Sequence, residues 1–191
     1  NLFDLYNQNK IYFLSQNIEQ KNLLVKHFQN KKNIFTIGMD TGFYRFKKIL
    51  TNTNFQKNII FHGNKLDAKG FTYCVKLSEF IPEYTFIFPF EKPKEFTNNL
   101  QNIKFIKMDW NTGLKEHIIK SEFTACISMW SAPIESSLIK SIIYGNHVLS
   151  FDAPHSFQQE IPDNIIVKLN HDIVNSSQII KSYFNKSPEY N

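Results

Sequence analysis

The chain has 191 residues, of which 42% are hydrophobic and 20% charged, so it can bury a substantial core and is not intrinsically disordered. This length indicates one large domain, or one domain with a fragment of another. The net charge of +5 comes almost wholly from scattered lysines, with Arg45 the only arginine, which argues against nucleic-acid binding. Such a field suits a solvated surface, and it also attracts an anionic diphosphate or an acidic membrane surface.

The first part of the chain alternates strand, helix and strand. Asn17, with Gln20 three residues later, predicts a helix start of the capping-box type. The expected elements are a strand at 11–14, a helix from 17 through 28, a strand at 33–37, and a linker with a short helix at 43–50.

From Asn58 onward, short apolar runs alternate with helical stretches. The expected strands are 59–62, 84–88, 103–107, 124–129, 146–151 and 164–169. The expected helices are 71–80, 114–120, 135–144 and 173–184, with an exposed loop at 91–102. This alternation predicts an α/β fold, a Rossmann-like parallel sheet flanked by helices, which binds ligands beyond the carboxyl ends of its strands.

Cys74 and Cys126 lie far apart in apolar surroundings, so we expect buried, reduced thiols in a reducing compartment. The sequence shows no signal peptide and no apolar run of about 18 residues. We therefore expect a cytoplasmic location, with peripheral contact at the inner face of the membrane as an option. The chain begins with Asn1 in mid-pattern, which suggests a fragment with further sequence upstream.

Scarce glycines mark the junctions between these elements. Four of the six glycines fall in an ordered series of motifs. The series is Ile37-Gly38-Met39-Asp40-Thr41 with Phe46, then Phe61-His62-Gly63, Lys69-Gly70, Pro133-Ile134-Glu135 and Gly145-Asn146-His147-Val148. Its order resembles the donor-binding, carboxyl-terminal half of GT-B glycosyltransferases, the retaining group that includes glycogen synthase, over about residues 10 to 185.

The resemblance implies a domain plan and a substrate. Residues 1–40 would be a remnant of the amino-terminal acceptor domain, 41–57 the linker, 58–170 the nucleotide-sugar-binding domain, and 171–191 a carboxyl-terminal helix and tail. Most of the acceptor domain would be missing from this chain. The active site would lie between the two halves, so the isolated chain should bind nucleotide weakly and catalyse nothing.

Two departures from the family pattern bear on this resemblance. Asn64 stands where the family has arginine, with Lys65 beside it as a substitute. Lys140 or Ser141 stands where the family has the second of two glutamates, the one that grips the nucleotide ribose.

A departing diphosphate needs positive charge, which a metal, a lysine or a helix N-terminus can supply. The sequence has no metal-type spacing, so we expect no metal and no other cofactor. Lys69, ahead of the helix at 71–80, is a candidate catalytic and diphosphate-binding residue, with a plain surface lysine as the alternative. Gly63, Asn64 and Lys65 are candidate binding residues of the same loop, although Gly63 also suits a simple turn.

The start of the helix at 135–144 supplies further candidates. Ser136 and Ser137 are expected to present a diphosphate-binding N-terminus, and Ser131 could reach a phosphate or merely enter the helix. Glu135 resembles the family glutamate beside the donor sugar and is the second candidate catalytic residue. Its alternative role is a favourable charge at the helix dipole.

Two tryptophans follow predicted strands. Trp110 could stack on a nucleobase or simply cover the core, and Trp130 is expected in the core.

The expected activity is transfer of a sugar from a nucleoside diphosphate sugar to a cell-surface glycan or lipid-linked acceptor. A module that has lost catalysis and serves in docking is one alternative, which the departures at Asn64 and at the second glutamate favour. A relative of nucleotide-sugar epimerases or a polyol-phosphate transferase is another.

Overall fold

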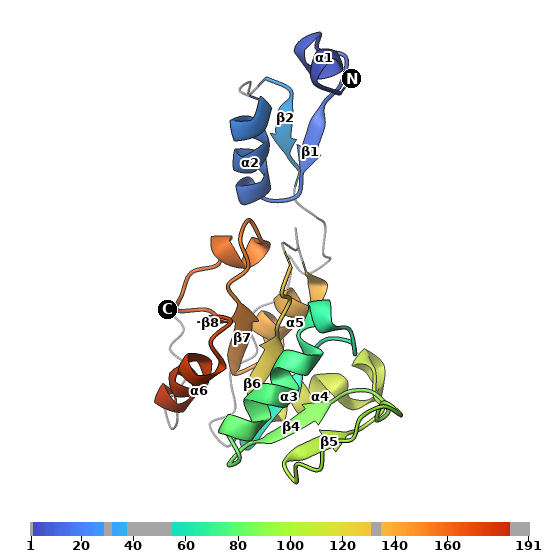
Figure 1. Cartoon of the computed structure of the whole chain (residues 1–191), viewed down its shortest axis with the longest axis vertical. Coiled ribbons are helices and arrows are strands. Elements are labelled where there is room, and N and C mark those ends of the chain that lie inside the picture. The colour runs from blue at the N-terminus through green and yellow to red at the C-terminus, as the bar shows by residue number, and fades with distance from the viewer. Residues whose placement is uncertain (1, 29–31, 38–54, 131–134, 184–191) are drawn as a thin grey trace.

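The computed structural model describes residues 2–28, 32–37, 55–130 and 135–183. Two parallel sheets organise these residues, a small one near the N-terminus and a six-stranded one in the rest of the chain (Figure 1). The helix predicted at 43–50 lies outside the described residues.

The N-terminal unit is a short strand–helix–strand motif preceded by one helix. Its elements are α1 (Leu2–Asn7), β1 (Phe13–Ser15), α2 (Ile18–Phe28) and β2 (Ile34–Thr36). The helix start is as predicted, because the Asn17 side-chain oxygen accepts a hydrogen bond from the Gln20 amide at 2.7 Å. α1 was not expected from the sequence. A hydrogen bond joins this unit to the rest, from the Glu19 amide to Glu160 Oε1 at 2.9 Å.

One face of the small sheet carries exposed apolar side chains. Leu14 of β1 lies opposite Phe35 of β2 in the parallel register, and the two are 60% and 46% exposed. Tyr12, just before β1, and Ile37, just after β2, are exposed as well, and the Tyr12 and Phe35 rings lie 6.1 Å apart. Parallel strands are normally covered on both faces, so this face is unusual.

The six-stranded sheet contains the predicted α/β alternation. Its elements are β3 (Gln56–Phe61), η1 (Asp67–Lys69), α3 (Phe71–Phe80), β4 (Thr85–Phe88), β5 (Ile103–Phe105), η2 (Trp110–Leu114), α4 (Lys115–Lys120), β6 (Ser121–Cys126), α5 (Ser136–Tyr144), β7 (His147–Phe151), η3 (Phe157–Glu160), β8 (Val167–Leu169) and α6 (Ile173–Ser182). All strand pairs are parallel, in the order β5-β4-β3-β6-β7-β8. The strand order reverses between β3 and β6, as in Rossmann-like folds.

Helices cover both faces of this sheet, in a pattern that follows from strand periodicity. Ile59 and Phe61 pack in one core with α3 and α6, whereas Ile60, between them, packs with Ile118 of α4 on the opposite face. The side chain of Tyr73 on α3 reaches Ser176 Oγ of α6 at 2.7 Å. The last helix therefore packs on the six-stranded body.

Two other expectations can be compared with the structure. Cys74 and Cys126 are buried and free, as predicted. Burial raises the pKa of Cys126 to about 12, which keeps this thiol protonated at neutral pH. Among the described helices, none has the length and apolar character needed to cross a membrane.

Candidate functional site

The carboxyl ends of β3 and β6 define the crevice where an open parallel sheet of this order binds ligands. Two sequence-predicted residues meet there from opposite sides. Lys69 ends η1, which follows β3, and Glu135 follows β6 and immediately precedes α5. The two residues are far apart in the sequence, and the topology of the sheet brings them together.

The turn that carries Lys69 is fixed against the segment after β6. Gly70 has φ +80°, and a Cβ atom there would lie 2.4 Å from the Ile127 carbonyl oxygen, so only glycine fits without a shift. The Met129 amide donates a hydrogen bond to the Ala68 carbonyl at 3.0 Å. These two contacts hold the lysine backbone beside Ser128.

Lys69, Ser128 and Glu135 form a small polar cluster, hereafter the switch-point cluster. The Lys69 ammonium donates to Ser128 Oγ at 3.2 Å and forms an ion pair with Glu135 Oε1. The Ser128 hydroxyl donates to the same carboxylate oxygen. The Glu135 side chain is only 5% exposed, whereas that of Lys69 is 28% exposed. The pair therefore lies at the carboxyl edge of the sheet, with the lysine partly open to solvent.

The Glu135 side chain does not cap α5 by a hydrogen bond, while a favourable charge at the helix dipole stays a prediction. Glu135 is the N-cap residue of α5, but its side chain makes no capping hydrogen bond and turns instead toward Lys69. Its second oxygen, Oε2, is buried and has no hydrogen-bond partner among the described residues. An unsatisfied buried acceptor is costly, so it marks a place where a donor group of a ligand would be stabilised.

Backbone amides at the start of α5 face the same region of the fold. The first hydrogen bond at this end joins the Ile139 amide to the Glu135 carbonyl at 3.1 Å, so residues 136–138 have no intrahelical acceptor. Ser136 is exposed and Ser137 half-buried at this helix start. The candidate Ser131 lies outside the described residues.

The loop between β3 and η1 holds the other predicted binding residues. The Asn64 side-chain oxygen accepts a hydrogen bond from the Leu66 amide at 3.1 Å, so it shapes the turn. Lys65 is exposed and makes no hydrogen bond or ion pair within the described part of the chain. At Gly63 a Cβ atom would meet the Phe61 ring at 2.7 Å, which explains the glycine by packing.

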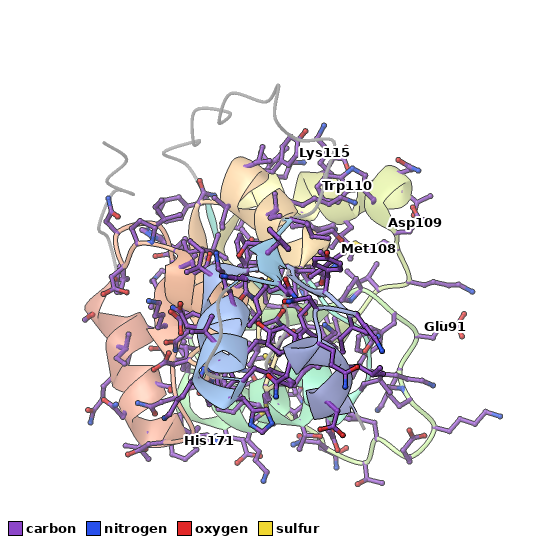
Figure 2. All side chains as sticks on the ribbon, turned by 90° about the horizontal axis from the view of Figure 1, so that it is seen from above. Glu91, Met108, Asp109, Trp110, Lys115 and His171 are labelled. Atoms are coloured by element: carbon purple, nitrogen blue, oxygen red, sulfur yellow. The ribbon has the colours of Figure 1, made fainter. Side chains whose placement is uncertain are left out.

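Trp110 covers the core. Its ring stacks on His62 with centroids 5.9 Å apart and meets the Tyr144 ring at 5.4 Å. The Lys140 ammonium lies 4.6 Å from the same ring centre. Figure 2 shows Trp110 beside Met108, which belongs to the same hydrophobic cluster. These contacts belong to the core-covering role, and nucleobase stacking by Trp110 stays a prediction.

His62 lies under this aromatic lid. Its Nδ1 atom is 2.8 Å from Ser141 Oγ. Burial, with a smaller effect of the Lys140 charge, lowers the pKa of His62 to about 4. Lys140 and Ser141 occupy the place of the second family glutamate, and they contact Trp110 and His62 respectively. Neither position supplies a carboxylate.

Two residues of the site were missed by the sequence analysis. Ser128 is buried and bridges Lys69 and Glu135, and its only sequence signal is a hydroxyl at the end of an apolar run. Trp130 was expected in the core, which is wrong, because its side chain is 50% exposed. Its ring lies over the Lys69 ammonium, with 5.2 Å between the nitrogen and the ring centre.

Comparison with known proteins identifies the class of fold. No protein-family model and no curated protein matches the chain. The fold itself is that of one half of a GT-B protein, a six-stranded parallel sheet flanked by helices, which confirms the predicted fold class.

Two solved structures show this likeness. The crystal structure of TarM superposes with a TM-score of 0.69 at 19% sequence identity, covering 96% of this chain and 38% of TarM. A point mutant of S. aureus TarM, in complex with fondaparinux, α-GlcNAc-glycerol and UDP, gives a TM-score of 0.67 at 21% identity and covers 94% and 38% of the two chains. The present chain therefore spans well under half of the proteins that it resembles.

Proposed function

We propose that the six-stranded unit is the donor-binding half of a glycosyltransferase, and that the switch-point cluster holds a nucleoside diphosphate sugar. The observation that carries the proposal is the buried Glu135, turned away from its helix toward Lys69, with one carboxylate oxygen that has no hydrogen-bond partner among the described residues. The Lys69 ammonium can bind a phosphate, and the neighbouring Glu135 Oε2 can accept a hydrogen bond from a sugar hydroxyl. The pair therefore suits a ligand in which a phosphate is joined to a sugar.

The chemistry assigns each residue a role. Sugar transfer breaks the bond between the sugar and the diphosphate, so negative charge grows on the departing phosphate. Lys69 and the amides of residues 136–138, which have no intrahelical acceptor, would stabilise that charge. Glu135 Oε2 would accept a hydrogen bond from a sugar hydroxyl and orient the ring. Ser136 and Ser137 would contribute their amides, with Gly63, Asn64 and Lys65 on the neighbouring loop.

The structural neighbour supports the ligand class. A TarM variant was solved with UDP and with a GlcNAc unit linked to glycerol, which correspond to a nucleoside diphosphate and a glycoside. We propose that this chain serves the same kind of reaction, with a glycan or lipid-linked acceptor. Metal-independent chemistry remains a prediction, and within the described residues no three His, Cys, Asp or Glu side chains gather as a metal site.

The N-terminal unit supports the proposal that the complete protein contains a second, acceptor-binding half. A two-stranded parallel sheet is marginal alone, and this one exposes Tyr12, Leu14, Phe35 and Ile37 on one face. We propose that residues 1–40 belong to the acceptor-binding half, whose remaining strands and helices would cover that face. Membrane contact, if the acceptor is lipid-linked, would belong to the complete protein.

Three observations favour an alternative function. Lys69 is already paired with Glu135, Asn64 is used within its turn, and Lys140 lies over Trp110. All three features are compatible with a module that docks other proteins and no longer binds nucleotide sugars. An epimerase relative would differ from both, because it would convert the sugar nucleotide without an acceptor.

Calorimetric titration with UDP, GDP, CDP and their monophosphates tests the proposal. We expect saturable binding of one diphosphate, tighter than its monophosphate, and about tenfold weaker in a Lys69→Ala variant. Lys107→Ala is the matched control, because Lys107 follows the edge strand β5 and forms an exposed ion pair with Glu91, outside the switch-point cluster. Equal losses in the two variants, or no binding by folded protein, would contradict the proposed donor site and favour the docking module.

A further inference from the structure

Trp130 is the largest exposed apolar side chain at the carboxyl edge of the six-stranded sheet. It follows β6 by a few residues and is 50% exposed, although tryptophan is usually well buried. Trp110, the other tryptophan of the chain, packs against His62 and Tyr144. An exposed indole beside a crevice presents an apolar, electron-rich face to a ligand.

The position of this indole restricts which part of a ligand it can touch. The ring centre lies 5.2 Å from the Lys69 ammonium, which in turn is paired with Glu135. A phosphate oxygen bound by Lys69 would lie about 3 Å from that nitrogen. A group of the same ligand that stacks on Trp130 therefore lies close to this phosphate.

In a nucleoside diphosphate sugar, the sugar ring meets this requirement. It is joined to its phosphate through a single oxygen, whereas the base is separated by the ribose and a second phosphate. Pyranose rings also carry a face of C–H groups, which suits an indole surface, while their hydroxyls need polar partners. Glu135 Oε2, buried and unsatisfied within the described residues, supplies such a partner on the other side of Lys69.

We infer that the Trp130 indole stacks on the ring of the transferred sugar and acts as a specificity-determining residue. This inference rests on the proposed function, since it requires a nucleoside diphosphate sugar at the switch-point cluster. Lys69 would then bind the phosphate, Glu135 would accept a hydrogen bond from a hydroxyl, and Trp130 would stack on the apolar face of the same ligand.

The test compares UDP, UDP-glucose and UDP-GlcNAc, with GDP and GDP-mannose as a second series, on the full chain by calorimetry. We expect Trp130→Ala to weaken binding of the preferred sugar nucleotide by about tenfold and to leave the parent diphosphate within about twofold. Trp130→Phe should retain sugar-nucleotide affinity within about threefold. Phe80→Ala is the matched control, because Phe80 is 40% exposed and ends α3 at the opposite edge of the sheet.

Fluorescence gives a second readout that does not depend on the alanine variant folding. The wild-type emission should change when the sugar nucleotide binds, and Trp130→Phe, which keeps only Trp110, should bind without that change.

If the wild-type protein binds no nucleotide at all, the proposed function and this inference are both overturned. If it binds, but Trp130→Ala affects sugar nucleotide and diphosphate equally or not at all, only the inference fails. A fluorescence change that persists in Trp130→Phe would also overturn it.

Discussion

In the ion pair of Lys69 and Glu135, each charged group reduces the capacity of the other to bind a ligand. The lysine is partly exposed and can be hydrated, but the carboxylate is almost fully buried. Removing the negative charge alone would leave the lysine available to an external anion. The affinity of Lys69 for an external anion therefore depends on the charge of Glu135.

Glu135→Gln isolates this effect, because the amide keeps the shape of the side chain and an acceptor for Lys69 and Ser128. We expect the nucleoside diphosphate to bind about threefold to tenfold more tightly, and the advantage of the sugar nucleotide over the diphosphate to fall. Glu91→Gln is the control, since Glu91 pairs with Lys107 at the surface. Weaker diphosphate binding in Glu135→Gln, measured by calorimetry, would contradict this role.

His62 predicts a pH dependence of stability. Burial and the Lys140 charge lower its pKa in the folded state to about 4, from 6.5 when unfolded. The unfolded chain therefore binds a proton more readily below pH 6.5, so the free energy of unfolding should fall as the pH drops from 6.5 toward 4. The loss is at most about 3 kcal/mol.

The measurement is urea unfolding of the wild-type protein and His62→Gln at pH 7, 5.5 and 4.5. The variant should lose less stability on acidification than the wild type. Parallel pH profiles for the two proteins would show that His62 does not carry the effect.

At the scale of elements, the turn between η1 and α3 sets the geometry of the site. Gly70 at this turn has φ +80° and touches Ile127, whereas Gly113 in η2 has φ +126° and nothing within 4 Å of a Cβ atom. The two glycines share positive φ but differ in available space. Replacing each glycine by alanine therefore introduces backbone strain at both positions but a steric clash only at Gly70.

Gly70→Ala should lower the free energy of unfolding by about 3 kcal/mol or more, and Gly113→Ala by about 1 kcal/mol. Because Lys69 adjoins Gly70, the first variant should also weaken diphosphate binding. Chemical denaturation and calorimetry measure the two effects. Similar losses of stability in both variants would mean that the contact with Ile127 contributes little.

Much of the element order could be predicted from the sequence, and the exceptions have physical causes. The helix at 71–80 was predicted with its observed bounds. β6 starts at Ser121, earlier than predicted, because Ser121 and Glu122 read as polar turn residues. In the fold both are buried, and the Tyr84 hydroxyl donates to the Glu122 carboxyl group.

The candidate site was predicted as residues but not as an arrangement. Lys69 and Glu135 were both chosen from local motifs, yet their ion pair depends on β3 and β6 being neighbours in the sheet. Trp130 illustrates the limit of local reasoning, because an apolar residue after an apolar strand reads as core. In the three-dimensional structure the Trp130 side chain is instead exposed, and it lies beside Lys69.

At the scale of the whole molecule, the exposed face of the small sheet should govern self-association. Tyr12, Leu14, Phe35 and Ile37 form an apolar surface that water covers poorly. We expect the chain to associate with rising concentration. Leu14→Ser combined with Phe35→Ser should reduce that association while the unfolding of the six-stranded body stays unchanged.

Sedimentation velocity over a concentration series measures the effect. Val174→Ser is the control, because Val174 is 49% exposed on α6, outside the small sheet. Equal association in the double variant and the wild type would show that another surface is responsible.

The ion pair at the switch point also determines which anions can compete for the site. Glu135 is tethered beside Lys69 by the fold, so it acts as an internal competitor at a high effective concentration. Chloride has to displace it and cannot donate a hydrogen bond to the released carboxylate. A ligand that also donates a hydrogen bond to Glu135 Oε2 keeps the carboxylate stabilised after displacement. The pair would thus favour ligands that carry a hydrogen-bond donor over chloride.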